Sequence, residues 1–205
     1  MEDEFILALI LVLIGIVLTE IIVLIKDWLR RRNEIQTIRG LLFHDFTRLH
    51  DLIAEYYQKT HAAGDLLWKD KSIADKIISG KESGFSVAIN YSLNFGLNFW
   101  PAISNSGNLI KLELNEIQAC QSTKEMLDLI DENVTLGNEE FDSKIQTLLK
   151  KNTEENVKRA DVALAVLDFL NARRHTYQTA KEQMWPVLNL NWMENKKGIH
   201  FKSRS

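Results

Sequence analysis

The sequence predicts a mainly α-helical protein with one N-terminal transmembrane helix. This helix continues into a juxtamembrane helix and then a cytosolic helical domain that contains a small antiparallel β-hairpin or sheet (α+β). Three observations support this class. Residues 5–25 form an apolar run with one ionisable side chain. Apolar residues recur at helical spacing through most of the remaining chain. Residues 85–99 alternate between apolar and polar side chains, which is typical of a strand.

The composition excludes several function classes. The chain has 205 residues and a formal net charge of −3, so no strongly basic field favours nucleic acid. Its one cysteine, Cys120, lies in an apolar helical row and fits a core thiol in a reducing compartment. The sequence has no metal-ligand spacing of Cys and His, no P-loop, and no GxSxG, HExxH or CxxC motif. We therefore expect no metal and no cofactor.

The first apolar run has the length of a membrane span. About 21 helical residues cover the roughly 30 Å of a hydrocarbon layer. Residues 1–4 are acidic or neutral, whereas Lys26 and residues 30–32 are basic. Positive flanks stay in the cytoplasm, which predicts an inner-membrane protein with its N-terminus outside. Trp28 fits the interfacial aromatic belt, and membrane lipid is the expected surrounding.

Two residues inside this run bear on assembly. Glu20 interrupts the apolar sequence near its inner end, where a carboxylate in lipid is costly. It is interpreted either as part of a ring that lines an oligomeric pore or helix interface, or as a side chain that reaches the inner headgroups. Gly15 is a single small residue without a GxxxG partner.

Four segments follow from the hydropathy pattern: an extracytoplasmic tail (1–4), the transmembrane helix (5–25), a juxtamembrane helical stalk (26–61) and a cytosolic domain (62–205). Apolar side chains recur along the stalk at helical spacing, and Asp45 occupies one of these steps. This apolar face can pack on the same chain's domain or on a neighbouring subunit. A shorter helix is expected over 65–79.

The alternating residues favour β-structure in the middle of the chain. Every odd position from Phe85 to Phe99 is apolar, and every even position is small or polar. A second alternating run at 110–114 completes an antiparallel hairpin in this interpretation, and a third follows at 188–192. A buried helix over 85–99 is the alternative.

Further helices are expected over 115–133, 141–151 and 153–184. The sequence Leu136-Gly137-Asn138 predicts a turn between the first two. Pro186 closes the last helix.

Arg174 is the most informative polar residue of the domain. It falls on the apolar face of the long 153–184 helix, and a buried cation needs a partner. One interpretation is an internal ion pair, or a stem that covers apolar surface. The other is an anion pocket that Arg174 forms with Arg173, His175 and one of the lysines at 196 or 197, for a phosphate-bearing ligand or nucleotide.

Arg39 and His44 have R-x4-H spacing. This motif resembles that of HEPN-type ribonucleases, in which such an Arg and His meet in a helical dimer and support RNA cleavage. The anchor, the chain length and these two residues are similar to a small membrane-anchored HEPN-like family that accompanies type VI CRISPR systems. On one unbroken helix a five-residue offset separates the side chains by about 140°, so they would not converge within one chain.

The sequence leaves three functions open. The leading one is a bacterial single-pass membrane protein that homo-oligomerises, in which the cytosolic domain senses a signal and controls a membrane pore or a membrane perturbation. Its layout resembles membrane effectors of antiphage defence. The second is an anchored scaffold or sensor that binds a partner protein, a phosphate or a nucleotide, without a pore and without catalysis. The third is an RNA-cleaving enzyme, which we do not favour.

Overall fold

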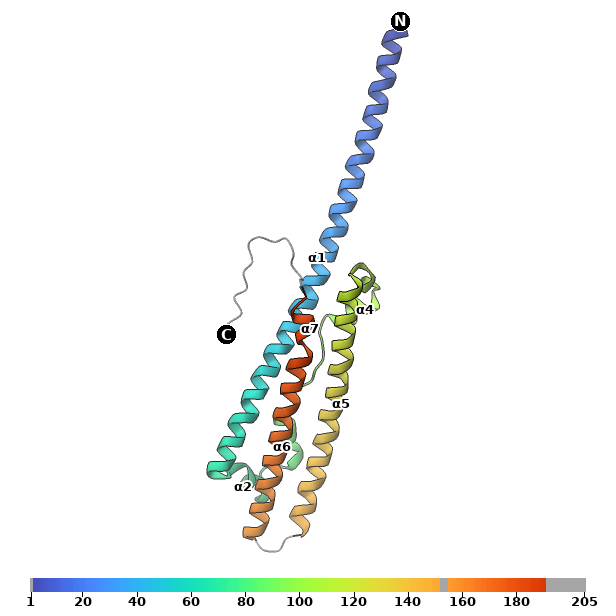
Figure 1. Ribbon diagram of the computed structural model, residues 1–205. Coiled ribbons are helices and arrows are strands. Elements are labelled where there is room, and N and C mark those ends of the chain that lie inside the picture. Colours follow the sequence, from blue (N-terminus) through green and yellow to red (C-terminus); the bar gives the residue numbers. More distant parts are fainter. Residues whose placement is uncertain (1, 152–154, 191–205) are drawn as a thin grey trace. The chain divides into compact units, whose positions relative to one another are not determined.

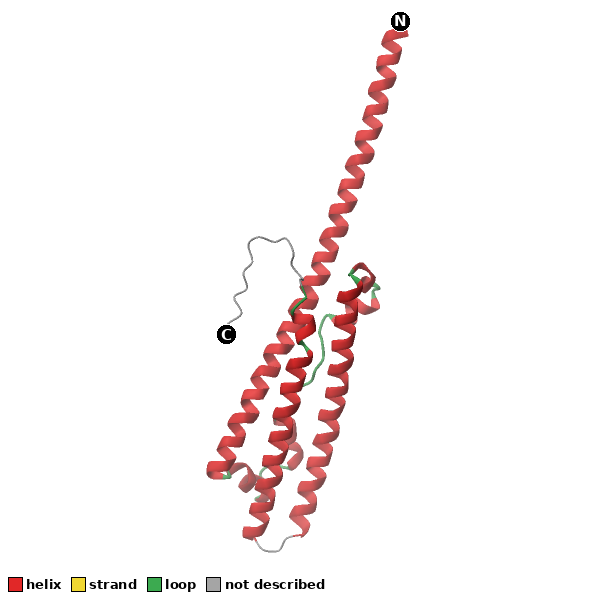
Figure 2. Ribbon diagram, in the orientation of Figure 1, coloured by secondary structure: helices red, strands yellow, loops and turns green. Residues whose placement is uncertain are grey.

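The structure is a computed structural model that describes residues 2–151 and 155–190. The side chains of 2–9 and 155–157 lie outside the described part. The elements are helical along the described chain (Figure 2). In order they are α1 (Glu2–Asp70), α2 (Ser72–Ile78), α3 (Gly84–Asn90), α4 (Trp100–Asn105), the 3-10 helix η1 (Asn108–Lys111), α5 (Leu114–Lys151), α6 (Glu155–Gln183) and α7 (Trp185–Leu188).

The chain divides into two compact units, and α1 runs through the boundary between them. The N-terminal unit ends at Leu41, and the second unit is Leu42–Leu190. In the second unit α5 packs along α6, α3 packs on α5, and α2 packs on α6 (Figure 1). The connection between α1 and α2 is a single residue, Lys71, whose positive φ of 51° interrupts the helix.

Apolar side chains from all of these helices fill the second unit. Phe141 of α5 and Phe169 of α6 stack with 4.3 Å between their ring centroids. Burying such side chains contributes about 1.5–3 kcal/mol each, which makes this interior the main source of stability. The remaining members of this cluster come from five helices: Ala63, Leu67, Ala74, Ile77, Val87, Ala88, Ile145, Val162, Ala163, Ala165, Val166 and Leu170.

The prediction of a membrane-spanning helix is corrected by the structure. Among the described residues, none of the helices is both long enough and apolar enough to cross a membrane. The predicted span is the apolar run of residues 5–25. Glu20 lies within it, and Lys26 and Asp27 follow directly. Residues 5–9, which begin the predicted span, lie outside the described side chains.

This finding also overturns what depended on that helix. The inner-membrane location with the N-terminus outside, the single-pass description and the membrane pore are predictions that the described residues do not support.

The predicted β-hairpin is wrong, because the described residues contain no strand. Residues 84–90 form α3 instead. The Ser83 hydroxyl accepts from the Ser86 amide at 3.0 Å, and the Asp142 carboxylate on α5 accepts from the Phe85 amide at 2.7 Å. Both bonds satisfy amides at the start of a helix, where no helical acceptor is available.

Within residues 85–99, buried and exposed side chains alternate only after α3. Residues 91–99 connect α3 to α4 without regular secondary structure, and within this segment Leu93, Phe95 and Leu97 are buried and the residues between them are exposed. The Phe95 amide donates to Asp131 at 3.3 Å, rather than to a neighbouring strand. The run at 110–114 falls on η1 and the start of α5, and 188–190 end α7; residues 191–192 lie outside the described part.

Two helix boundaries also differ from the prediction. The helix that begins before residue 26 continues to Asp70, so no break occurs at Gly64, and the 65–79 helix is divided at Lys71. The turn predicted at 136–138 is absent, and α5 is one helix from Leu114 to Lys151. An internal glycine costs a helix only about 1 kcal/mol, and at Gly137 the absence of a Cβ leaves room for the Arg173 side chain.

Candidate functional site: a cleft between α1 and α6

A half-enclosed cleft of about 210 Å³ lies between the end of α1 and the middle of α6. Gly64 and Leu167 form its narrow part, where a Cβ on Gly64 would lie 4.0 Å from Leu167 Cδ1. Counted from His61, four α1 residues follow one helix face at i, i+3, i+4 and i+7, with Thr60 beside them, and the α6 residues follow another face at i, i+4 and i+7. The complete lining is Thr60, His61, Gly64, Asp65, Trp68, Leu167, Asn171 and Arg174.

The cleft combines an aromatic surface with groups of both charges. Trp68 is 78% exposed, which is unusual for an indole. His61 Nδ1 lies 3.4 Å from Asp65 Oδ2, one turn along α1, and both side chains remain partly in water. Thr60 is buried, and its hydroxyl donates to the Tyr57 carbonyl at 2.8 Å. The groups that can meet a ligand are therefore Trp68, His61, Asp65, Asn171 and Arg174.

The three residues predicted as an anion pocket separate in the structure. Arg174 is exposed and lines the cleft. Arg173 is 4% exposed and points into the second unit. His175 is exposed, and its Nδ1 lies 3.5 Å from the Thr179 hydroxyl on the same helix. The lysines at 196 and 197 lie outside the described residues. Only Arg174 is placed where a ligand in this cleft could meet it.

Arg173 joins α6 to α5. Its Nη2 donates to the Val134 carbonyl and to Asn138 Oδ1, both at 2.6 Å. Its Cζ lies 4.9 Å from the Phe169 ring centroid. A Cβ on Gly137 would come within 3.1 Å of Nη2, so the glycine leaves room for the guanidinium. Burial lowers the pKa of Arg173 from its ordinary value. Both acceptors are neutral, which gives Arg173 a structural role.

Asp45 is a buried carboxylate that sequence reasoning noticed without assigning a role. It is fully buried, and it accepts from the amides of Asn98 and Phe99 at 2.9 and 2.7 Å. Arg48 Nη2 donates to the Gly96 carbonyl at 3.1 Å and lies 3.5 Å from Asp45. The sequence signal for Asp45 was an acidic residue at one of the helically spaced apolar positions of α1. Asp45 fixes the end of the 91–99 segment where α4 begins.

The remaining predicted site residues all lie on α1. Arg39 belongs to the N-terminal unit and His44 to the second unit. His44 is exposed, and its ring meets Phe99 edge to face with 6.1 Å between centroids. Glu20 is exposed, and nothing lies within 4 Å of a Cβ on Gly15. Trp28 is 58% exposed, with Arg32 Cζ 5.4 Å from its ring centroid.

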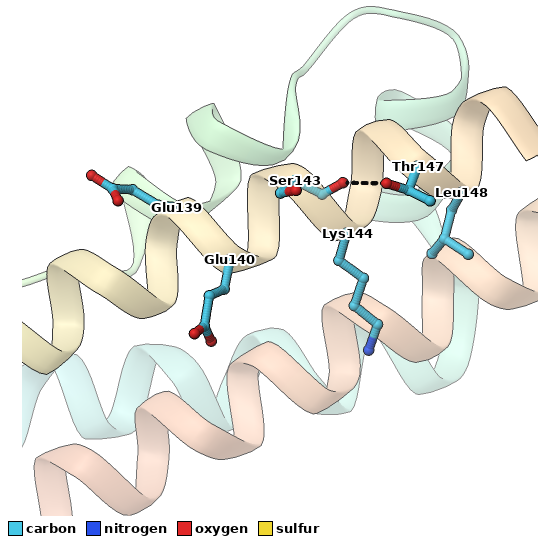
Figure 3. A pocket seen from close by; sticks show the side chains of 6 residues that line it. All are labelled: Glu139, Glu140, Ser143, Lys144, Thr147 and Leu148. Carbon is cyan, nitrogen blue, oxygen red and sulfur yellow. Dashed lines mark hydrogen bonds between the residues drawn. The ribbon is translucent and has the colours of Figure 1, made fainter.

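A larger but more open hollow lies along α5 (Figure 3). Its volume is about 530 Å³, and Glu139, Glu140, Ser143, Lys144, Thr147 and Leu148 line it. Lys144 extends toward α6, where its Nζ lies 3.4 Å from Asp168. All six residues come from one helix, so they do not converge on an enclosed ligand. We therefore place the candidate site in the smaller cleft.

Cys120 is expected to be inert in the folded protein. Burial raises the pKa of its thiol to about 12, so almost no thiolate, the reactive form, exists at pH 8. Iodoacetamide should leave native protein unmodified at pH 8 and should label it fully in urea, as read by intact mass. Labelling of the native chain at the rate of a free thiol would contradict the buried placement.

Three comparisons with known proteins complete the description of the site. No protein-family model, no curated protein and no solved structure matches this chain.

Proposed function

We propose that Leu42–Leu190 is a ligand-binding sensor module that holds a nucleoside monophosphate in the cleft between α1 and α6. The observation that carries the proposal is the pairing of an exposed indole, Trp68, with an exposed guanidinium, Arg174, at one half-enclosed cleft. An indole presents a flat apolar face to a base. A guanidinium binds phosphate oxygens in a bidentate manner.

The length of the cleft along the two helices suits a nucleoside monophosphate. His61 and Trp68 are seven residues apart on α1, or about 10 Å along the helix. The α6 residues Leu167 and Arg174 have the same offset. Figure 1 shows the two helices running in opposite directions, and Gly64 lies opposite Leu167. Because Trp68 follows Gly64 on α1 and Arg174 follows Leu167 on α6, the two side chains belong to opposite ends of the cleft. A base on Trp68 therefore directs its phosphate toward Arg174.

The other lining groups give the cleft its polarity. Asp65 lies between the two ends, where a carboxylate accepts from sugar hydroxyls or from an exocyclic amine. Asn171 can both donate and accept there. A volume of about 210 Å³ is below the roughly 300–1,000 Å³ of pockets that enclose drug-sized ligands. A single nucleotide is therefore favoured over a dinucleotide.

Arg174→Ala is expected to weaken binding of a nucleoside monophosphate by about 10- to 100-fold. This is the range that follows from losing a charge-assisted hydrogen bond worth about 1.5–3 kcal/mol. The measurement is isothermal titration of the full chain with AMP, GMP, CMP and UMP separately, with inorganic phosphate as a further probe. Trp68→Leu should also weaken nucleotide binding, but it should leave phosphate binding unchanged, because only the stacking surface is removed.

Lys181→Ala is the matched control, since Lys181 is an exposed cation on the same helix outside the cleft. It should bind like the wild type. The proposal fails if none of the four nucleotides binds at 1 mM, or if Arg174→Ala and Lys181→Ala bind equally well.

A further inference from the structure

The N-terminal unit carries an apolar helical surface that takes no part in the cleft of the second unit. From Ile10 to Leu29 the large apolar side chains of α1 are between 45% and 66% exposed. Soluble proteins rarely leave so large a contiguous apolar surface in water. A surface of this kind marks a site of association, and the sequence pattern indicates what occupies it.

One face of this segment has the spacing of a coiled-coil seam. Its positions are separated alternately by four and three residues, which is the heptad rule for a and d sites. Isoleucine occupies two a positions and one d position, a choice that favours close packing of identical helices. The seam consists of Ile10, Ile14, Val17, Ile21, Leu24 and Trp28.

Charged residues beside the seam favour a parallel arrangement of identical helices. In this register Asp27 is a g position and Arg32 is an e position. In a parallel pair the g residue of one helix lies beside the e residue five positions later in its partner, so Asp27 faces Arg32 of the second copy. Asp27 is half exposed, and its neighbour Arg30 lies at 3.6 Å on the same helix. An antiparallel pair would not bring these opposite charges together.

The flanking positions also indicate how many copies meet. Leu11, Leu18 and Ile25 occupy the e positions before Arg32 and widen the apolar face. A dimer covers little more than the a and d side chains, whereas larger bundles also cover e positions. We propose that residues 10–32 of α1 form a parallel, in-register bundle of three or more copies of this chain. This inference does not depend on the cleft or its ligand.

Disulfide trapping tests the register directly. Ile21 lies on the seam, and Val23 lies off it at a c position; the two are 45% and 47% exposed in the single chain. Each is replaced by cysteine in a full-length Cys120→Ala background. Under copper-phenanthroline oxidation Ile21→Cys should form covalent dimers at least about tenfold faster than Val23→Cys, because only seam positions bring Cβ atoms within disulfide distance.

Charge reversal tests the parallel orientation. Asp27→Arg and Arg32→Asp should each raise the dissociation constant about fivefold, and the double variant should recover it to within about twofold. Lys26→Glu, at an f position facing away from the seam, is the control that should change little. Mass photometry and sedimentation of the full chain give the copy number, which should be at least three.

Several outcomes would overturn the proposal. Equal rates of disulfide formation at positions 21 and 23 would show that Ile21 does not lie on a seam between copies. If the measured mass is that of one copy at all concentrations, the chain does not self-associate. Single copies that bind phosphatidylcholine–phosphatidylglycerol vesicles without forming the Ile21→Cys disulfide would show that lipid, rather than another copy, covers the helix.

Discussion

Asp45→Ala is expected to lower the free energy of unfolding by about 3 kcal/mol, as measured by urea denaturation of the full chain. The carboxylate is fully buried and accepts two backbone amides, from Asn98 and Phe99, beside the start of α4. Alanine leaves both part-buried amides without this acceptor, and an unpaired amide that is partly shielded from water costs free energy. Arg48 also loses its carboxylate neighbour.

Hydrogen exchange locates this effect. The amides of Asn98 and Phe99 should exchange much faster in Asp45→Ala, because the bonds that protect them are removed. Asp51→Ala is the matched control: Asp51 lies on the same helix, its side chain is 76% exposed, and its partner is His50 at 3.5 Å. It should change stability by less than about 0.5 kcal/mol. Equal stability of the two variants would refute the proposed clamp on residues 91–99.

Arg173→Ala is expected to destabilise the chain by about 3 kcal/mol, whereas Arg174→Ala should cost less than about 0.5 kcal/mol. The first substitution removes two charge-assisted hydrogen bonds to α5 and the contact with the Phe169 ring, and it leaves a cavity. The second removes an exposed side chain. Urea denaturation of the two variants measures both, and each serves as the control for the other. Comparable losses in the free energy of unfolding would contradict a structural role for Arg173 and a ligand-binding role for Arg174.

A double-mutant cycle with Gly137 tests the packing of this guanidinium. In an open helix interior Gly→Ala stabilises by about 1 kcal/mol. Here the new Cβ meets Arg173 Nη2 at 3.1 Å. Gly137→Ala should therefore give its full gain in the Arg173→Ala background and a smaller gain, or a loss, in the wild type. Identical effects in both backgrounds would show that the two residues do not interact.

The helix over 153–184 and the start of the helix at Asn115 could be predicted from the sequence to within a few residues, whereas the end of the latter helix could not. The predicted helix over 153–184 corresponds to α6, Glu155–Gln183, and the helix expected from Asn115 corresponds to α5, which begins at Leu114. In these segments the apolar side chains recur every three to four residues, so local pattern and tertiary burial agree. The candidate site was predicted only in part. Arg174 was singled out, but Trp68, Asp65 and Asn171 were not, because an exposed indole has no signature in a single sequence.

The alternating segment shows why the rest could not be predicted. Leu93, Phe95 and Leu97 are buried in turn, as the pattern indicates, but alternation does not specify what receives the backbone hydrogen bonds. The acceptors are Asp45 and Asp131, carboxylates from distant helices. A neighbouring strand would have been equally consistent with the sequence, and only the packing of α1 and α5 around this segment excludes it.

The same distinction separates Arg173 from Arg174. Adjacent residues on a helix differ by about 100° in direction, and the apolar stripe of α6 is wide enough that either arginine could face inward. The sequence by itself determined that a cation borders this stripe, that α1, α5 and α6 are helices, and that α1 carries an apolar surface. The tertiary structure decided which arginine is buried, because only one position has Gly137 opposite to make room and acceptors on α5 within reach. Such pairings depend on which helices become neighbours, and that is a property of the whole chain rather than of any segment.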